Sequence, residues 1–115
     1  MRGRKWALGA LEGEARDLAG TGVGRRNNKL NAVVHRLATM AARGWLLEDE
    51  IFTATWRACE TNGYLGSKDS SDGPASFRAT FDSAFRSGLL KPAPDPRERL
   101  SNISNTINLK ARASV

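Results

Sequence analysis

The chain has 115 residues, which is enough for one domain with a modest core. Its net charge is +6 at pH 7 and its isoelectric point is about 10.2, so we expect an acidic partner such as nucleic acid or a nucleotide. The single Cys59 excludes an internal disulfide and a cysteine-cluster metal site. No apolar run approaches the roughly 18 residues needed to span a bilayer, so we predict a cytoplasmic protein without a membrane partner.

The first half of the chain predicts two helices. The first runs from about Arg4 to Ala19, and a glycine-rich loop over 20–24 ends it. Its inward face is predicted to consist of Leu8, Leu11, Ala15 and Leu18. Asn27 or Asn28 is the expected N-cap of the second helix, which continues to Arg43. The apolar side of this second helix is predicted to consist of Leu30, Val33, Val34, Leu37 and Ala41.

The second half predicts two further helices. One runs from Glu48 to about Thr61, with acidic residues in its first turn, where a helix favours them. The other starts near Pro74 and ends at Gly88. Its core face is predicted to consist of Phe77, Phe81, Ala84 and Phe85. The polar loop between these two helices has one apolar anchor, Tyr64–Leu65.

These elements predict an all-α fold, a small bundle of four to five helices. Residues 1–92 form the predicted bundle domain. Residues 93–115 contain a proline-rich linker and a marginal C-terminal helix or tail that packs on the bundle or leaves it. In that tail Leu100, Ile103 and Ile107 are spaced three and four residues apart.

The segment Gly24–Asn31 has the residues expected at a phosphate site. Backbone N–H groups at a helix start and arginine side chains both bind phosphate oxygens. The candidates in this segment are Arg25, Arg26, Asn27, Asn28 and Lys29. The alternative is structural: asparagine caps a helix and arginine lies on a solvated loop.

Further candidates for nucleic-acid or nucleotide contact lie outside this segment. Arg36 follows Lys29 by seven residues and shares its helix face. Tyr64 is the aromatic side chain best suited to stack on a base. Arg78, Arg86 and Ser87 lie on the last helix, where Asp82 offers an alternative ion-pair ladder with the arginines. No nucleophile motif, phosphate-binding glycine loop or metal cluster is present, so we expect no catalytic residue, no metal and no resident cofactor.

Five motifs occur in an order that resembles a known family. They are Ala10–Glu14, Gly24–Asn31, Gly44–Ile51, Asn62–Tyr64 and Phe85–Leu89. Residues 8–92 thereby resemble the helix-bundle domain that follows the catalytic domain of phage and plasmid primase-polymerase replication proteins. The family motif has one arginine where this chain has Arg25 and Arg26, so either of the two can correspond to the arginine of the motif.

The resemblance implies a non-catalytic accessory domain that binds single-stranded DNA template and nucleotide to support primer initiation. The catalytic domain, its Mg²⁺ and a helicase domain would belong to the same parent protein, in a bacterial host cell. Two alternatives remain. One is a helical protein–protein adaptor in a replication complex, and the other is a helix-turn-helix binder of duplex DNA.

Overall fold

Four α-helices make up the fold. The structure, a computed structural model, describes residues 2–67 and 72–94. The helices are α1 (Arg2–Ala19), α2 (Arg26–Ala41), α3 (Glu48–Thr61) and α4 (Pro74–Leu89), and no strand occurs within the described residues. The predicted all-α bundle is therefore confirmed, whereas the predicted C-terminal helix lies outside the described residues. No helix in this part of the chain is both long and apolar enough to cross a membrane.

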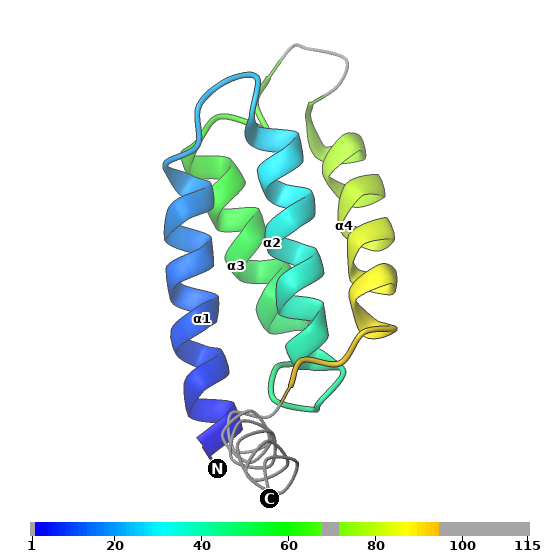
Figure 1. Cartoon of the computed structure of the whole chain (residues 1–115). Coiled ribbons are helices and arrows are strands. Elements are labelled where there is room, and N and C mark those ends of the chain that lie inside the picture. The colour runs from blue at the N-terminus through cyan, green and yellow to red at the C-terminus, as the bar shows by residue number, and fades with distance from the viewer. Residues whose placement is uncertain (1, 68–71, 95–115) are drawn as a thin grey trace, which may run out of the picture.

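The helices alternate in direction along the chain. α1 and α3 run toward the upper end of the bundle in Figure 1, and α2 and α4 run toward the lower end. The α1–α2 loop and the described parts of the α3–α4 loop therefore lie together at the upper end. The start of α3 and the end of α4 both lie toward the lower end (Figure 1).

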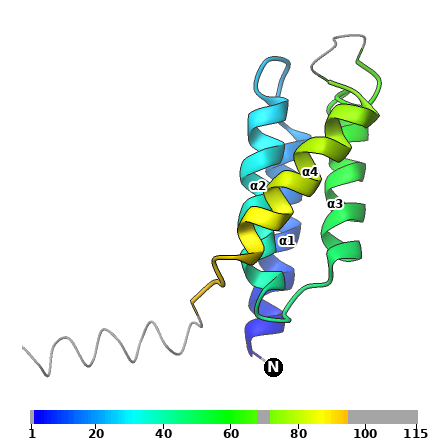
Figure 2. The same cartoon turned by 90° about the vertical axis from the view of Figure 1, so that its right-hand side faces the viewer.

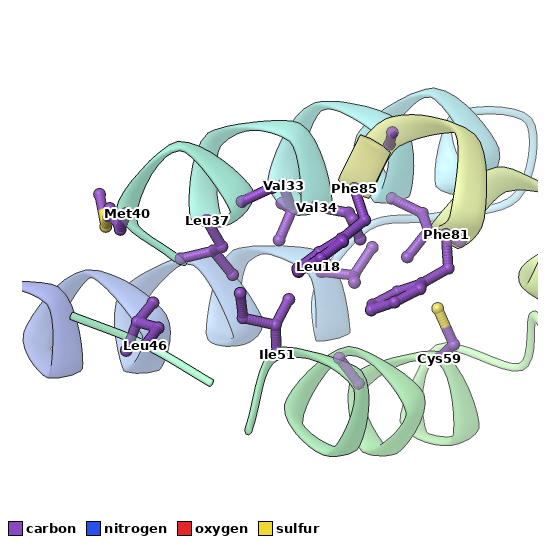
Figure 3. Packing of buried hydrophobic residues seen from close by; sticks show 14 of the residues in the cluster. Leu18, Val33, Val34, Leu37, Met40, Leu46, Ile51, Cys59, Phe81 and Phe85 are labelled. Atoms are coloured by element: carbon purple, nitrogen blue, oxygen red, sulfur yellow. The ribbon is translucent and has the colours of Figure 1, made fainter. Parts of the chain in front are cut away.

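Helix α2 is central because it contacts all three other helices, most extensively α4. Its predicted apolar face is buried at Leu30, Val33, Val34 and Leu37. These side chains meet residues from each neighbouring helix, as Figure 3 shows for Leu18, Ile51, Phe81 and Phe85. Spacings of three and four residues thus produced one continuous buried stripe, as expected for a helix of 3.6 residues per turn.

The crossing of α2 and α4 depends on Gly88. The sequence predicts that Gly88 ends its helix, but α4 continues to Leu89, so that prediction is wrong. Gly88 is instead buried against α2. A β-carbon on it would overlap the carbonyl oxygen of His35 and would lie 2.6 Å from the β-carbon of Ala38. The missing side chain lets the two helix backbones approach closely (Figure 2).

Aromatic rings fill the space between α3 and α4. The ring of Phe52 meets the rings of Phe77 and Phe81 edge-on, with centroids 5.4 Å and 5.1 Å apart. Trp56 contacts Phe77 in the same way at 5.1 Å. Phe52 and Trp56 are only half-buried, so they form the edge of the core. Large rings are needed here because α4 crosses the bundle diagonally, as Figure 2 shows.

The inward face of α1 differs from the prediction at Leu8, and the predicted Ala15 is half-buried without belonging to the core cluster. Ala7 and Leu18 are buried, and Leu11 packs against the core, but Leu8 is 39% exposed. Residues 7, 11, 14 and 18 form the stripe closest to the bundle, and residue 8 lies one step around the helix. The predicted burial of Leu8 is therefore wrong. Its spacing of three residues from Leu11 is helical, but it places Leu8 at the edge of the buried stripe.

An ion pair ties the start of α1 to the start of α3. The guanidinium of Arg4 donates to both carboxylate oxygens of Glu50, at 2.6 Å and 2.8 Å, and to the carbonyl oxygen of Trp45 at 2.9 Å. Glu50 also accepts from the backbone N–H of Leu47 at 2.9 Å, which caps α3. These hydrogen bonds lower the pKa of Glu50 to about 2, first through Arg4 and then through Leu47.

Candidate nucleic-acid interface

The candidate residues at the start of α2 divide between the inside and the outside of the bundle. Arg26 is buried with 6% of its surface exposed, whereas Arg25 and Asn28 are exposed and Lys29 is half-buried. The helix begins at Arg26, with Arg25 as the N-cap, so neither asparagine is the cap that the sequence predicts. The two adjacent arginines therefore have different environments.

Arg26 connects three parts of the chain at the upper end of the bundle. One terminal nitrogen (Nη1) donates to the carbonyl oxygen of Asn62 at 2.7 Å, and the other (Nη2) donates to Oδ2 of Asp72 at 2.7 Å. The guanidinium also lies over the ring of Tyr64, 6.0 Å from its centroid. Its donors point into the fold, so this geometry corrects the prediction that Arg26 contacts phosphate.

Tyr64 is fully buried and has no ring face available to a base. Its hydroxyl donates to Oδ1 of Asn27 at 2.8 Å and lies 2.9 Å from the hydroxyl oxygen of Ser76. Oδ1 of Asn27 also accepts from the hydroxyl of Thr80 at 2.9 Å. The base-stacking prediction for Tyr64 is therefore wrong, while its predicted role as the loop anchor is confirmed.

Sequence reasoning missed four partners of this internal polar cluster: Asn62, Asp72, Ser76 and Thr80. Asn62 also donates from its side chain to the carbonyl oxygen of Leu18 at 2.9 Å, which joins α1 to the cluster. Asp72 lies immediately before Gly73–Pro74, and the sequence there predicts only a turn. No periodic pattern relates these positions to Arg26, because the α3–α4 loop brings them together.

Arg25, Asn28 and Lys29 line an open groove on the outer side of the α2 start. The rest of the groove comes from the end of α1 and the α1–α2 loop: Asp17, Gly20, Thr21, Gly22 and, on α2, Ala32. Gly24 enters α2 with φ at +91°, a conformation that favours glycine. The structure thus collects three of the predicted phosphate contacts on one accessible surface.

The helix start beside this groove attracts negative charge. The N-cap residue Arg25 makes no capping hydrogen bond with its side chain, and the first turn of α2 contains no acidic residue. Its first backbone N–H groups therefore retain a partial positive charge that an anion can neutralise. By contrast, α3 begins with Glu48, Asp49 and Glu50. The groove itself contains one carboxylate, Asp17, which limits but does not cancel its positive charge.

The two cations of the groove, Arg25 and Lys29, form no ion pair with any residue that the structure describes. Within residues 2–67 and 72–94, neither Arg25 nor Lys29 has a side-chain hydrogen bond or salt bridge. Arg36, in contrast, pairs with Glu14 of α1 at 3.2 Å. Arg78 pairs with Asp82 at 3.5 Å and lies over the ring of Phe52, in keeping with the predicted ladder.

Arg86 and Ser87 are not close to the start of α2. They precede Gly88, which contacts His35 and Ala38. With a rise of 1.5 Å per residue, these contacts lie about 15 Å along α2 from Arg26. The sequence-based expectation that Arg86 and Ser87 face the Arg25–Lys29 cluster is wrong because α2 and α4 run in the same direction. Both residues line a separate open groove on α4.

The described residues contain no group of three or more His, Cys, Asp or Glu side chains placed to hold a metal ion. Comparison with known proteins adds no relative: no family model matches the chain, and no match was found among curated proteins or solved structures.

Proposed function

We propose that this chain is a non-catalytic accessory domain of a primase-polymerase replication protein and binds single-stranded DNA template at the Arg25–Asn28–Lys29 groove. The observation that carries the proposal is a pair of cations, without ion-pair partners among residues 2–67 and 72–94, beside a helix start whose N-cap side chain makes no capping hydrogen bond. Phosphate oxygens would accept hydrogen bonds from both side chains and from the first N–H groups of α2. The order of the five sequence motifs supports the assignment to replication proteins.

The arrangement favours backbone contact over base recognition. Arg25 and Lys29 are long, flexible cations at an open surface, and the one predicted stacking residue, Tyr64, is buried. Phosphate contacts hold a strand without reading its sequence. We therefore expect weak binding with little sequence preference, which the parent protein's catalytic and helicase domains would strengthen by holding the same strand. A nucleoside triphosphate, with Mg²⁺ from the parent enzyme, offers the same phosphate chemistry.

Fluorescence anisotropy with a labelled single-stranded oligonucleotide tests the proposal across a range of salt concentrations. Arg25→Ala/Lys29→Ala should weaken binding and reduce the salt dependence, because each lost phosphate contact lowers the log–log slope by about 0.7 for single strands. The matched control is Arg57→Ala/Lys91→Ala, which removes two cations outside the groove. That control should retain the slope of the unsubstituted protein.

Equal losses of affinity in the two double variants would show that binding depends only on net charge. That result would refute the groove as the binding site. Tighter binding of duplex than of single strands would favour the helix-turn-helix alternative. No binding at low salt would favour the adaptor. A parallel NMR titration with nucleoside triphosphate and Mg²⁺ should shift the amide signals of residues 25–29 if nucleotide shares the groove.

A further inference from the structure

The outer face of α4 forms an open groove of its own, the α4 groove. Its lining residues are Ala79, Asp82, Ser83, Arg86, Ser87 and Leu90. In Figure 2, α4 lies in front of the other helices, and no other described element covers this side of it. The α4 groove is independent of the proposed DNA-binding surface, since the two share no residue.

The α4 groove has a large apolar side chain at one end and a small one at the other. Leu90, the C-cap residue of α4, lines the groove and is 80% exposed. Ala79 is exposed eleven residues earlier, about three turns or 16 Å along the helix, and on the same side of it. The groove therefore offers both an apolar projection and a place small enough to receive one.

The charges of the α4 groove lie between these two ends. Asp82 and Arg86 are one turn apart, and Arg86 is exposed and pairs with no carboxylate in the described ranges. Asp82 pairs with Arg78 at 3.5 Å, but both side chains are largely exposed. Such a pair contributes little, so Asp82 remains available to a second cation. The groove thus presents one acid and one base at different heights along the helix.

We infer that the α4 groove binds the same groove of a second copy of this chain, with the two α4 helices antiparallel. In a two-fold arrangement every contact occurs twice. With the axis midway between residues 79 and 90, Leu90 of each copy packs on Ala79 of the other. The same register brings the guanidinium of Arg86 beside Asp82 of the other copy. Ser83, a small residue opposite the stem of Arg86, lets the two helices approach.

The charge pattern favours a second copy over a partner of a single sign. A wholly acidic partner would oppose Asp82, and a wholly basic one would oppose Arg86, whereas the antiparallel copy neutralises both. One pair of helices of this length buries less than about 1,200 Å², the range of weak and transient interfaces. We therefore expect a dimer whose population rises with protein concentration.

Sedimentation equilibrium of the full chain, without oligonucleotide, tests the inference separately from DNA binding. The apparent mass should rise with concentration from 12.5 kDa toward twice that value. Leu90→Glu should weaken association by roughly tenfold or more, because it places a charge in an apolar contact. Its side chain is exposed, so the bundle should remain folded. The matched control is Val23→Glu, an 82% exposed apolar residue on the α1–α2 loop, which should associate like the unsubstituted protein.

Charge reversal tests the antiparallel register itself. Asp82→Arg gives each copy two cations, and Arg86→Asp gives each copy two carboxylates, so either variant alone should stay monomeric. An equal mixture of the two should form a heterodimer, because each charge then meets its opposite. A mass of 12.5 kDa for the unsubstituted protein at every concentration would overturn the inference. Undiminished association of Leu90→Glu, or a mixture that remains monomeric, would overturn it as well.

Discussion

The carbonyl oxygen of His35 occupies the position that a side chain on residue 88 would need. This relationship fixes the closest approach of α2 and α4, the two helices with the most extensive contact. It also explains why a glycine is placed within the last turn of a helix, where glycine costs about 1 kcal/mol relative to alanine. The close crossing offsets that cost through the packing of Phe81 and Phe85 on α2 and α3.

Gly88→Ala should therefore destabilise the protein. Overpacking a closed interface costs typically about 1–3 kcal/mol, which exceeds the helix-propensity gain of about 1 kcal/mol. We expect a net loss of up to about 2 kcal/mol in the free energy of unfolding, measured with urea. Gly9→Ala is the control, because a β-carbon there meets nothing within 4 Å and should be neutral or stabilising. Equal effects at both positions would show that residue 88 does not limit the approach of the helices.

Arg25 and Arg26 should differ sharply in their response to substitution. Arg26→Met removes one partner of the buried pair with Asp72 and should cost about 3–5 kcal/mol of stability. Arg25→Ala should change stability by less than about 0.5 kcal/mol, because the side chain is exposed. Urea unfolding of both variants measures this difference. A comparable loss for both would show that the internal pair contributes little.

Acid should weaken the contact between α1 and α3 through Glu50. The pKa of Glu50 is about 2 in the folded protein, below its ordinary value of 4.5, so folding favours the ionised carboxylate. Its contribution to stability is complete above about pH 4.5 and is lost as the pH falls toward 2. We expect Glu50→Gln to be less stable than the unsubstituted protein at pH 7 and to approach it near pH 2.

The measurement for Glu50 is the free energy of unfolding at several pH values from 7 to 2. Glu12→Gln provides the control, since its pair with Arg16 is largely exposed and contributes little at any pH. A constant difference between Glu50→Gln and the unsubstituted protein across this range would contradict the assignment.

Cys59 should be chemically inert in the folded protein. Its side chain is fully buried, and burial raises the pKa of the thiol to about 12, so almost no thiolate exists at pH 8. Iodoacetamide should modify Cys59 only through unfolding, at a rate that rises with urea and in the Gly88→Ala variant. Mass spectrometry of timed samples measures this. Rapid modification of the native protein would show that this part of the core opens locally.

Apolar spacing was a reliable guide to the helices and to most of their buried faces. The stripe Leu30–Val33–Val34–Leu37 and the phenylalanines of α4 were predicted because burial repeats with the helical period. Gly88 shows the limit of local reasoning. A glycine near a helix end looks the same in the sequence whether it ends the helix or lets a neighbouring helix pack closely. Only the position of α2 distinguishes the two roles.

The sequence by itself determined an all-α fold and the presence of cations and amides at the start of α2. Only the tertiary structure decided their separation: Arg26 bonds inward to Asn62 and Asp72, and Asn27 bonds to the buried Tyr64, while Arg25 and Lys29 line the groove outside. The physical reason is that neighbouring residues on a helix point about 100° apart. Which of them faces the interior depends on where the distant α3–α4 loop packs, and no local pattern encodes that position.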